Sequence, residues 1–501
     1  MRHNIIKIGS FFFLFTLFYG CGNQSTIPNT DDTDTTEIST DITGQVRCSE
    51  QGIAGVVVTD GTNCTLTDEK GNYALPYNSL ATHIYISSPS GYTVPVASSV
   101  PQFYVKLTGH SVGKSNVNFN LIQSTVSDEK HYFIAIGDPQ VRNSSELAKL
   151  KPILGYLKTD IEKNNMNPVH LMIPGDVVFD TPTMHTESKT YYTPVGQPVY
   201  YCIGNHDHVQ NKTGTASDAY DKIADDTYVA NYGPTYYSFN RGQAHYIILD
   251  NIFYRGGSNT DYSCKLTQEQ LSWVKKDLSY VSKDKILFIM GHSPSKSRYL
   301  SVYGNYSELF ALLGGYKEVN IISGHTHYNS VLIDNTNITD HIIGAACGGW
   351  WEGPVCPDGT YMGYKIFEVD GTKVTWKYRA YTMPEKQFSV FKPAARTSPL
   401  RPSQELLVNV WDWDSTWSVT YSEDNGTTFK VLTRISSKTY DPTAVDYYGV
   451  DGDTSIPTGR GWIDAGPTDH IFTCIPGTGV TKIIVRVVNH FGEIFTEDVI
   501  L

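Results

Sequence analysis

The chain has 501 residues, more than one ordinary hydrophobic core requires, so we expect two to four domains. Its composition, with 40% hydrophobic and 18% charged residues, is typical of a globular protein. The formal net charge is −12 and no long basic run is present, which argues against a general nucleic-acid-binding protein, and no nucleic-acid-binding surface is evident.

The first twenty residues have the pattern of a secretory signal peptide. Arg2 and Lys7 precede an apolar stretch from Ile8 to Tyr19, which is too short for a comfortable membrane span. Residues 1–20 are therefore expected to direct export.

Gly20 and Cys21 follow this stretch, and a small residue directly before a cysteine resembles the bacterial lipobox. The resemblance implies cleavage before Cys21, lipidation of its thiol and anchoring to a membrane, in the periplasm or at the cell surface. The alternative is a plain signal peptide with an incidental cysteine. Residues 21–41 are almost free of apolar side chains and are expected to form a flexible tether.

Export makes the remaining seven cysteines candidates for disulfide bonds. The closest pairs in sequence, Cys48 with Cys64 and Cys347 with Cys356, are the preferred bridges, although sequence does not fix connectivity. An odd number leaves at least one thiol free. Cys202, in the apolar run VYYCIG, is expected to be a buried thiol.

Residues 42–124 consist of short alternating segments separated by Gly, Asp and Pro turns, which predicts a small β-sandwich. The stretches GVVVTDG and TLTDEKGNYAL resemble the carboxypeptidase-regulatory-like sandwich of exported bacterial proteins. This resemblance implies a spacer or docking module without catalysis.

The pattern changes at residue 131. HYFIAIGD, VHLMIPGD, PVYYCIGNHD, KILFIMGH and VNIISGH are apolar runs of buried-strand length, each ending in Gly and then Asp, Asn or His. Helical spacing follows serine caps in residues 144–161, and a capping box of Thr267 and Gln270 begins a second helix at residues 266–278. Residues 125–388 are therefore predicted to form an α/β domain, with its site at the strand ends.

The stretch PAARTSPLRPSQ is typical of a linker, and short β segments follow it to the end of the chain. Residues 389–501 are predicted to form a second β-sandwich.

The polar residues at the ends of the central strands are suited to metal binding. Two carboxylates, two amides and several imidazoles fit a pair of divalent ions better than one structural zinc, which would draw on cysteine. Each preceding Gly lets the backbone turn and approach the ions closely. The candidates are Asp138, Gln140, Asp176, Asn205, His206, His292, His325 and His327.

The order D-x-Q, GD, GNHD, GH, GHTH over residues 131–330 resembles the calcineurin-like metallophosphoesterases. The flanking sandwiches resemble modules carried by an exported bacterial subgroup of that superfamily. The resemblance implies two facing β-sheets wrapped by helices, with a dinuclear site at one end.

The same resemblance implies a role for each candidate. One metal would take Asp138, Gln140, Asp176 and His327; the other would share Asp176 and add Asn205, His292 and His325. The ions would be manganese, zinc or iron. A metal-bridged hydroxide would attack a phosphate mono- or diester, while His206 faces the substrate and protonates the leaving oxygen.

Two departures from the family pattern affect this set. The commoner first motif is D-x-H, whereas Gln140 offers a neutral oxygen, so one metal site is expected to be weaker or to prefer another ion. The aspartate that supports the general acid usually lies three residues after the bridging one, but Asp180 lies four residues after Asp176. The role of Asp180 is therefore left open, and Asp207 is expected to be only structural.

Substrate-binding residues are less clearly marked. The Gly-rich loop at 344–364 follows the GHTH strand, and adjacent Trp350 and Trp351 point to opposite sides of an extended chain, so at most one is expected to face a ligand. The alternative is a disulfide-pinned packing loop. Arg142 either holds a phosphate oxygen or is an incidental loop residue. The rival to an exported phosphoesterase is a non-catalytic surface-binding lipoprotein built on the same body.

Overall fold

The computed structural model describes residues 41–107, 116–210, 216–258, 260–334, 336–393, 404–435, 439–450 and 462–501. The predicted signal peptide, most of the tether and Cys21 lie outside these residues. Residues 40–501 form one compact unit. Among the described helices, none combines the length and the apolar character needed to cross a membrane.

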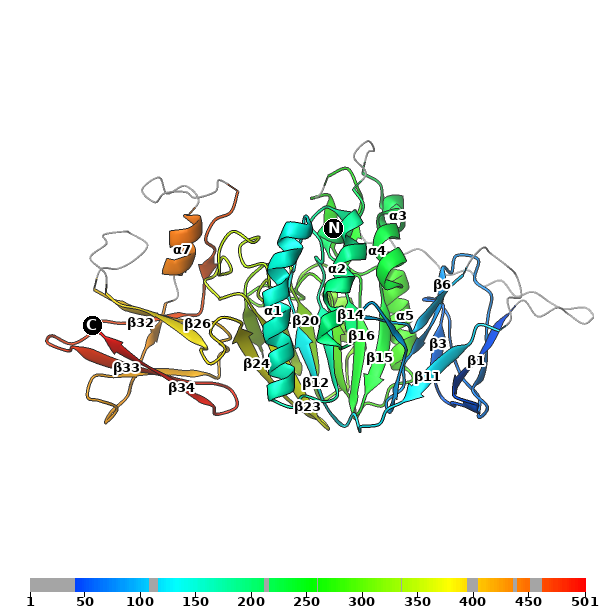
Figure 1. Cartoon of the computed structure of the whole chain (residues 1–501), viewed down its shortest axis with the longest axis horizontal. Coiled ribbons are helices and arrows are strands. Elements are labelled where there is room, and N and C mark those ends of the chain that lie inside the picture. The colour runs from blue at the N-terminus through cyan, green and yellow to red at the C-terminus, as the bar shows by residue number, and fades with distance from the viewer. Residues whose placement is uncertain are drawn as a thin grey trace, which may run out of the picture. The chain divides into compact units, whose positions relative to one another are not determined.

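The N-terminal part is a sandwich of two sheets (Figure 1). One sheet has the order β2-β1-β11-β7, with β5 paired to β1, and the other has the order β10-β6-β3-β4. A short hairpin, β8 (Val96–Ala97) with β9 (Val100–Pro101), follows β7. The strands of the two sheets are β1 (Ile42–Cys48), β2 (Gln51–Gly52), β3 (Val57–Thr59), β4 (Cys64–Leu66), β5 (Asn72–Leu75), β6 (His83–Ser87), β7 (Tyr92–Thr93), β10 (Tyr104–Lys106) and β11 (Phe119–Gln123).

The central part contains a five-stranded sheet, β14-β13-β12-β23-β24, and a six-stranded sheet, β15-β16-β19-β20-β22-β21. Strands β12, β13 and β14 are parallel, and so are β16, β19, β20 and β22. The bounds are β12 (Lys130–Ala135), β13 (Val169–Ile173), β14 (Val199–Tyr201), β15 (Tyr237–Arg241), β16 (Ala244–Ile248), β19 (Ile286–Met290), β20 (Val319–Ser323), β21 (Ser330–Ile333), β22 (Ile338–Ile342), β23 (Gly363–Asp370) and β24 (Lys373–Ala380).

The two faces of the five-stranded sheet contribute to two cores, because successive side chains alternate between faces. On one face, Phe133 stacks on Phe367 at 4.3 Å and meets Phe288 of the six-stranded sheet edge-on at 4.9 Å. On the other face, Ile134 belongs to a second apolar cluster together with Leu147 and other side chains of the first helix. The sheet is therefore buried on both faces, as the unbroken apolar runs predict.

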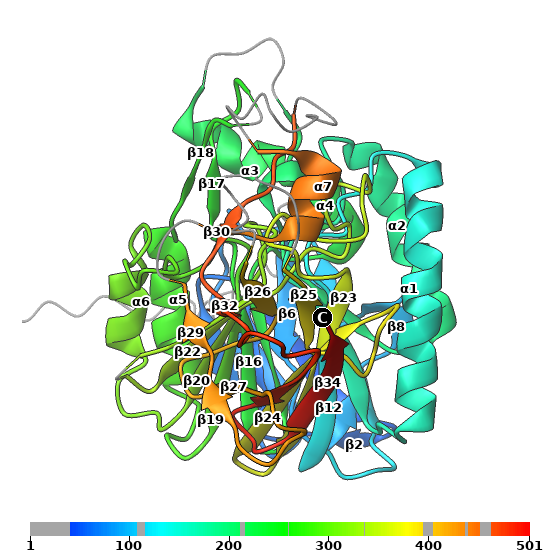
Figure 2. The same cartoon turned by 90° about the vertical axis from the view of Figure 1, so that its left-hand side faces the viewer.

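Helices cover the outer faces of the two central sheets: α1 and α2 lie on one side and α5 and α6 on the other (Figure 2). The helices are α1 (Ser144–Lys163), α2 (His185–Tyr191), α3 (Asp221–Ala224), α4 (Asp226–Tyr232), α5 (Gln268–Leu278) and α6 (Tyr306–Leu312). Short 3₁₀ turns are η1 (Pro182–Met184), η2 (Thr193–Val195), η3 (Asn205–Asp207) and η4 (Asp218–Tyr220), and β17 (Ile252–Tyr254) pairs with β18 (Tyr262–Cys264).

Both predicted helices are present, but their caps differ in detail from the prediction. The cap of α1 is Asn143, whose side chain accepts from the Glu146 amide at 3.0 Å, rather than a serine. Thr267 caps α5 as predicted. Gln270 uses its amide to bond both backbone groups of Asp250, at 3.0 and 2.8 Å, and so ties α5 to the end of β16.

The C-terminal part is a second sandwich, with sheets β25-β26-β32-β29 and β28-β27-β33-β34. The predicted multidomain architecture, a central two-sheet α/β domain between two β-sandwiches, is confirmed. The elements of the C-terminal part are β25 (Phe388–Phe391), β26 (Leu406–Val410), β27 (Ser418–Ser422), β28 (Lys430–Val431), β29 (Thr433–Arg434), β30 (Thr439–Tyr440), α7 (Pro442–Tyr448), β31 (Pro467–Thr468), β32 (Ile471–Cys474), β33 (Lys482–Val488) and β34 (Ile494–Ile500).

The two predicted disulfide bridges are wrong, because Cys48, Cys64, Cys347 and Cys356 are all free thiols. Cys48 and Cys64 belong to different sheets of the N-terminal sandwich. Sγ of Cys356 lies 3.5 Å from the Ala345 carbonyl, and Sγ of Cys347 lies 3.8 Å from the Gly348 carbonyl. Neither pair is bonded in the structure. Cys202 is a buried thiol, as predicted.

Candidate metal centre

Every predicted ligand lies just beyond the carboxyl end of a parallel strand. Asp138 and Gln140 follow β12, Asp176 follows β13, and Asn205 follows β14 in the five-stranded sheet. The remaining ligands come from the six-stranded sheet, with His292 after β19 and both His325 and His327 after β20. Parallel strands place these ends at one edge of each sheet, so residues up to 189 positions apart meet there.

The side chains of the set are in mutual contact. Ligand atoms of Asp138, Asp176 and His292 lie within 4.8 Å of one another. Nε2 of His292 is 3.2 Å from Oδ2 of Asp176 and 3.0 Å from Oδ1 of Asn205. Nδ1 of His325 is 3.1 Å from Nε2 of His292, and Nε2 of His327 is 3.9 Å from Oδ1 of Asp138. The structure therefore brings together both carboxylates, the three imidazoles and the Asn205 amide.

The backbone around the ligands is strained. Asp138, Gln140, Asp176, His325 and His327 all have φ between 36° and 69°, a left-handed conformation that non-glycine residues rarely adopt. Such outliers gather at sites where the surrounding structure holds side chains in a required position.

Two glycines are needed for the close approach of the strand ends. A Cβ on Gly204 would lie 2.3 Å from Oδ1 of Asp176, and a Cβ on Gly324 would lie 2.3 Å from Oδ2 of Asp138. Any larger residue would displace a carboxylate. The carboxylates that face Gly204 and Gly324 therefore leave room only for glycine at these positions of GNHD and GHTH.

The charges of the site favour a bound cation. Asp138 and Asp176 are 0% and 1% exposed, and within the described residues their recorded ion-pair partners are all histidines. Burial raises the pKa of Asp138 to about 8. Burial also lowers the pKa of His325 to about 3 and that of His327 to about 4, which keeps both imidazoles neutral and able to ligate. Although burial acts to lower the pKa of His292, Asp176 raises it to about 9, so this imidazole would give up its proton on binding a metal. Two buried carboxylates, three imidazoles and the Asn205 amide oxygen form a donor set that fits divalent metal ions.

Gln140 lies against the other ligands, but its amide nitrogen faces the carboxylate. Nε2 donates to Oδ2 of Asp176 at 2.6 Å, and Oε1 lies 4.0 Å from Sγ of Cys347. An amide binds a metal through its oxygen, so ligation requires the amide to be turned over. Ligation by Gln140 stays a prediction.

His206 lies beside the ligand cluster and is oriented by Asp180. Nδ1 of His206 is 2.8 Å from Oδ1 of Asp180, and the imidazole stacks on Phe179 at 4.2 Å. The backbone amide of His206 donates to Oδ1 of Asp176 at 2.9 Å. With Nδ1 engaged by Asp180, Nε2 is the nitrogen left for a substrate. The extra residue between Asp176 and Asp180 does not prevent this contact.

Asp207 has a structural role. Its two carboxylate oxygens accept from the backbone amides of Val178, at 3.0 Å, and Gly204, at 2.8 Å. These bonds join the loop after β13 to the loop after β14. These contacts agree with the structural role expected for Asp207.

The two tryptophans have different surroundings. The ring of Trp350 lies 4.5 Å from that of His327, at the edge of the site. Trp351 is 7% exposed, and its indole nitrogen donates to the Pro139 carbonyl at 3.0 Å. Both residues have left-handed φ angles in a turn, so the extended chain assumed for the prediction is wrong. The assignment of Trp351 to substrate binding is corrected, because it packs behind the loop of Asp138.

Arg142, Phe179, Trp350 and Trp462 form a rim beside the ligand cluster. Of these residues, the sequence indicated only Arg142 and Trp350. The guanidinium of Arg142 donates to Oε1 of Glu146 and lies 5.9 Å from the ring of Phe179 and 5.8 Å from that of Trp462. Trp462 is also 5.8 Å from Trp350. Phe179 could have been noticed beside Asp180 in GDVVFD, but nothing in the sequence connects Trp462, from the C-terminal part, with the strand ends.

Three family models match the chain in order. They are the N-terminal part of calcineurin-like phosphoesterase at residues 40–124, calcineurin-like phosphoesterase at residues 131–329, and its C-terminal part at residues 340–495. The chain belongs to the calcineurin-like phosphoesterase family, whose members use a dinuclear metal site. The predicted family is confirmed.

Solved structures resemble the chain only distantly. A dimetal phosphatase from Danio rerio is 12% identical, with 50% of this chain and 96% of that chain covered and a TM-score of 0.35. A 5′-nucleotidase from Candida albicans is 13% identical, with 52% and 53% covered and a TM-score of 0.33. GAP50, the anchor in the inner membrane complex of Plasmodium, is 18% identical, with 51% and 86% covered and a TM-score of 0.34. No curated protein matches the chain.

Proposed function

We propose that this protein is an exported, metal-dependent phosphoesterase that hydrolyses phosphate mono- or diesters. The observation that carries the proposal is the pairing of His206 with Asp180, 2.8 Å apart, beside a buried cluster of Asp138, Asp176 and His292. A site that only stored metal would need the cluster but not an oriented, partly exposed imidazole next to it.

Two divalent ions, of manganese, zinc or iron, would be held by the ligands that lie at the strand ends. The family pattern assigns Asp138, Gln140, Asp176 and His327 to one ion and Asp176, Asn205, His292 and His325 to the other. When bound, such ions activate a water molecule for attack on phosphorus and neutralise the phosphoryl oxygens.

The protein's own residues orient the ester and supply a proton. His206, held by Asp180 through Nδ1, donates from Nε2 to the leaving oxygen. Arg142 and Trp350 lie at the rim, where a guanidinium and an indole face suit a phosphate and an organic group. Asp207 keeps the loop of His206 against the loop of Asp176 through its two backbone bonds.

Hydrolysis of p-nitrophenyl phosphate and bis-p-nitrophenyl phosphate, with Mn²⁺ and after chelation, tests the activity. We expect turnover of at least one ester that is lost on chelation and regained with Mn²⁺. The rival, a binding lipoprotein without catalysis, predicts metal binding with no turnover of either ester. Comparing the two rates also separates a monoesterase from a diesterase.

We also propose that the protein is anchored to a bacterial membrane through lipid on Cys21. Support comes from the basic start, the short apolar stretch from Ile8 to Tyr19 and the small residue before the cysteine. Expression with labelled palmitate should label the wild type and leave Cys21→Ser unlabelled and released from the membrane fraction. Equal membrane association of both proteins would contradict the anchor.

A further inference from the structure

A second cluster of buried ligand-type side chains lies behind the loop that carries His206. It contains His208, Asp225 and Asp250, whose ligand atoms all lie within 4.8 Å of one another. The three residues are 1%, 8% and 5% exposed. They come from the end of η3, the junction of α3 with α4, and the end of β16. None of them belongs to the metal centre described above.

His208 presents a nitrogen lone pair to this cluster. Its Nδ1 lies 2.8 Å from the Gly204 carbonyl, and only a protonated Nδ1 can bond that oxygen. In the neutral imidazole, Nε2 is therefore the acceptor nitrogen, and within the described chain it has no hydrogen-bond partner although it is fully buried. A buried nitrogen in this state is costly unless a cation or a donor meets it.

A second acceptor lies beside this lone pair. Oδ1 of Asp225 lies 3.2 Å from Nε2 of His208, yet neither atom forms a hydrogen bond among the described residues. Asp225 stands at the start of α4, where an aspartate usually caps the helix, but its side chain accepts no cap bond there. Its carboxylate is instead directed toward His208.

Several carboxylates lie around the cluster, which raises the cost of charging any one of them. Burial raises the pKa of Asp225 to about 8, and burial followed by Asp225 and Asp221 raises that of Asp250 well above its ordinary value. Lys222 lines the same cavity, but its Nζ lies 3.1 Å from Glu269 and its side chain is 74% exposed. The shifts in pKa mean that the cluster holds either protons or another positive charge.

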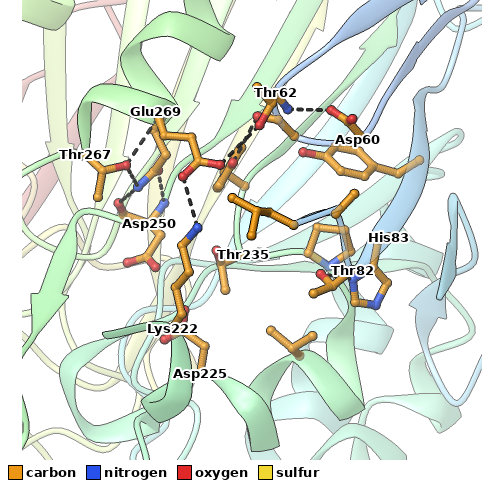
Figure 3. A pocket seen from close by; sticks show the side chains of 18 of the residues that line it. Asp60, Thr62, Thr82, His83, Lys222, Asp225, Thr235, Asp250, Thr267 and Glu269 are labelled. Carbon is orange, nitrogen blue, oxygen red and sulfur yellow. Dashed lines mark hydrogen bonds and ion pairs between the residues drawn. The ribbon is translucent and has the colours of Figure 1, made fainter. Parts of the chain in front are cut away.

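Two residues of the cluster border a cavity of about 190 Å³. Asp225 and Asp250 line this cavity together with Lys222 and Glu269, as Figure 3 shows. Asp60, Thr62 and His83 of the N-terminal sandwich form another part of its wall. An ion could therefore enter and keep water as a further ligand.

We propose that His208, Asp225 and Asp250 bind a divalent transition-metal ion, in addition to the ions of the phosphoesterase centre. One imidazole and two carboxylates suit ions such as zinc and manganese. Ligands about 2.0–2.2 Å from one ion are at most about 4.4 Å apart, so the separations here require only a small contraction. The ion ties the segment after His206 to α4 and β16. Binding of this ion does not depend on the proposed hydrolysis.

Zinc binding tests this site when the phosphoesterase centre is disabled. In the double variant Asp138→Asn/Asp176→Asn, we expect about one zinc equivalent to remain after dialysis against Zn²⁺ and gel filtration. Adding Asp225→Asn should remove that ion or weaken its binding at least about tenfold, as measured by elemental analysis and calorimetry. Zn²⁺ should raise the melting temperature of the first protein and not of the second.

Asp277→Asn is a matched control. Asp277 also forms a buried pair with a histidine, 2.8 Å from Nε2 of His245, but Nδ1 of that ring is 3.0 Å from Asn240 and both nitrogens are satisfied. In the same double-variant background, this substitution should leave the zinc equivalent in place.

The proposal is overturned if the folded double variant retains no zinc, or if its zinc is insensitive to Asp225→Asn. A cluster held only by a shared proton predicts that Asp225→Asn, which resembles the neutral acid, keeps or raises the melting temperature and that Zn²⁺ has no effect. If Asp225→Asn does not fold, His208→Gln gives the same test, because its amide can still donate to the Gly204 carbonyl.

Discussion

At the scale of single residues, His206 distinguishes chemistry from binding. The imidazole is oriented through Nδ1 by Asp180 and is not in the ligand set. We expect His206→Asn to retain its metal and to lower turnover by roughly a hundredfold or more, the usual scale of general acid catalysis. The loss should be largest for alkyl esters and smallest for nitrophenyl esters, whose leaving group needs little help from a proton.

Steady-state rates of the wild type and of His206→Asn across a series of leaving groups, together with the metal content of each preparation, measure this loss. A uniform loss would indicate stabilisation of charge in the transition state instead of proton donation. Loss of metal would show that His206 is a ligand.

The pH dependence of turnover should depend on Asp180. Burial acts to lower the pKa of His206, but Asp176 and Asp180 raise it above its ordinary value. A general acid works only while protonated, so activity falls as the pH rises through this pKa. Asp180→Asn removes one of the two raising charges and should move the alkaline limb of the kcat profile to lower pH. An unchanged limb would mean that His206 is not the group that titrates.

Gln140 tests how the first motif binds metal. Its amide nitrogen faces Asp176 at 2.6 Å, whereas an imidazole would offer a stronger neutral donor. We expect Gln140→His to tighten the site that contains Asp138 and His327, seen as greater resistance of the activity to a chelator. No change, or weaker binding, would show that residue 140 does not ligate.

At the scale of secondary-structure elements, the site could be predicted because each ligand directly follows a strand. The apolar runs define the strands, and parallel order then brings their carboxyl ends to one edge. The positions of Asp138, Asp176 and His292 follow from this argument without any knowledge of the contacts between them.

Elements without such a pattern could not be predicted. Trp350 and Trp351 lie in a turn with left-handed φ, so strand alternation gave no valid guide to their directions. Trp462 belongs to the C-terminal part and contacts Arg142 of the central part, and His208 is recognised as a candidate ligand only by its proximity to Asp225 and Asp250. In each case the decisive contact is tertiary and leaves no periodic signal.

Strand β23 of the central sheet is joined to the C-terminal sandwich by a buried ion pair. Nζ of Lys365 lies 2.8 Å from Oδ1 of Asp412, and the two side chains are 0% and 1% exposed. Asp412→Ala leaves the Lys365 charge buried without a partner and should cost about 3–5 kcal/mol in the free energy of unfolding. Urea denaturation measures this loss.

The exposed pair of Lys482 and Asp498, 2.7 Å apart, is the control, since Asp498→Ala should cost less than about 1 kcal/mol. Lys365→Met/Asp412→Leu should recover most of the stability, because an apolar pair replaces the buried charges. An Asp412→Ala cost no larger than that of Asp498→Ala would contradict a structural role for the buried pair.

At the scale of the whole molecule, two sandwiches flank a body whose ligands come from both central sheets. The C-terminal part also contributes to the rim of the site through Trp462, which lies 5.8 Å from both Arg142 and Trp350. The C-terminal part therefore contributes to the surroundings of the site.

Hydrolysis is proposed to depend on two ions held at the strand ends. The most direct measurement follows activity while Mn²⁺ is added to chelated Asp225→Asn protein, in which the proposed additional site is removed. Activity toward p-nitrophenyl phosphate, or toward its diester, should rise until two equivalents are bound and then stay constant, and Asp176→Asn in the same protein should abolish both the tight binding and the turnover. Full activity with one equivalent, or activity in the chelated protein, would contradict the account.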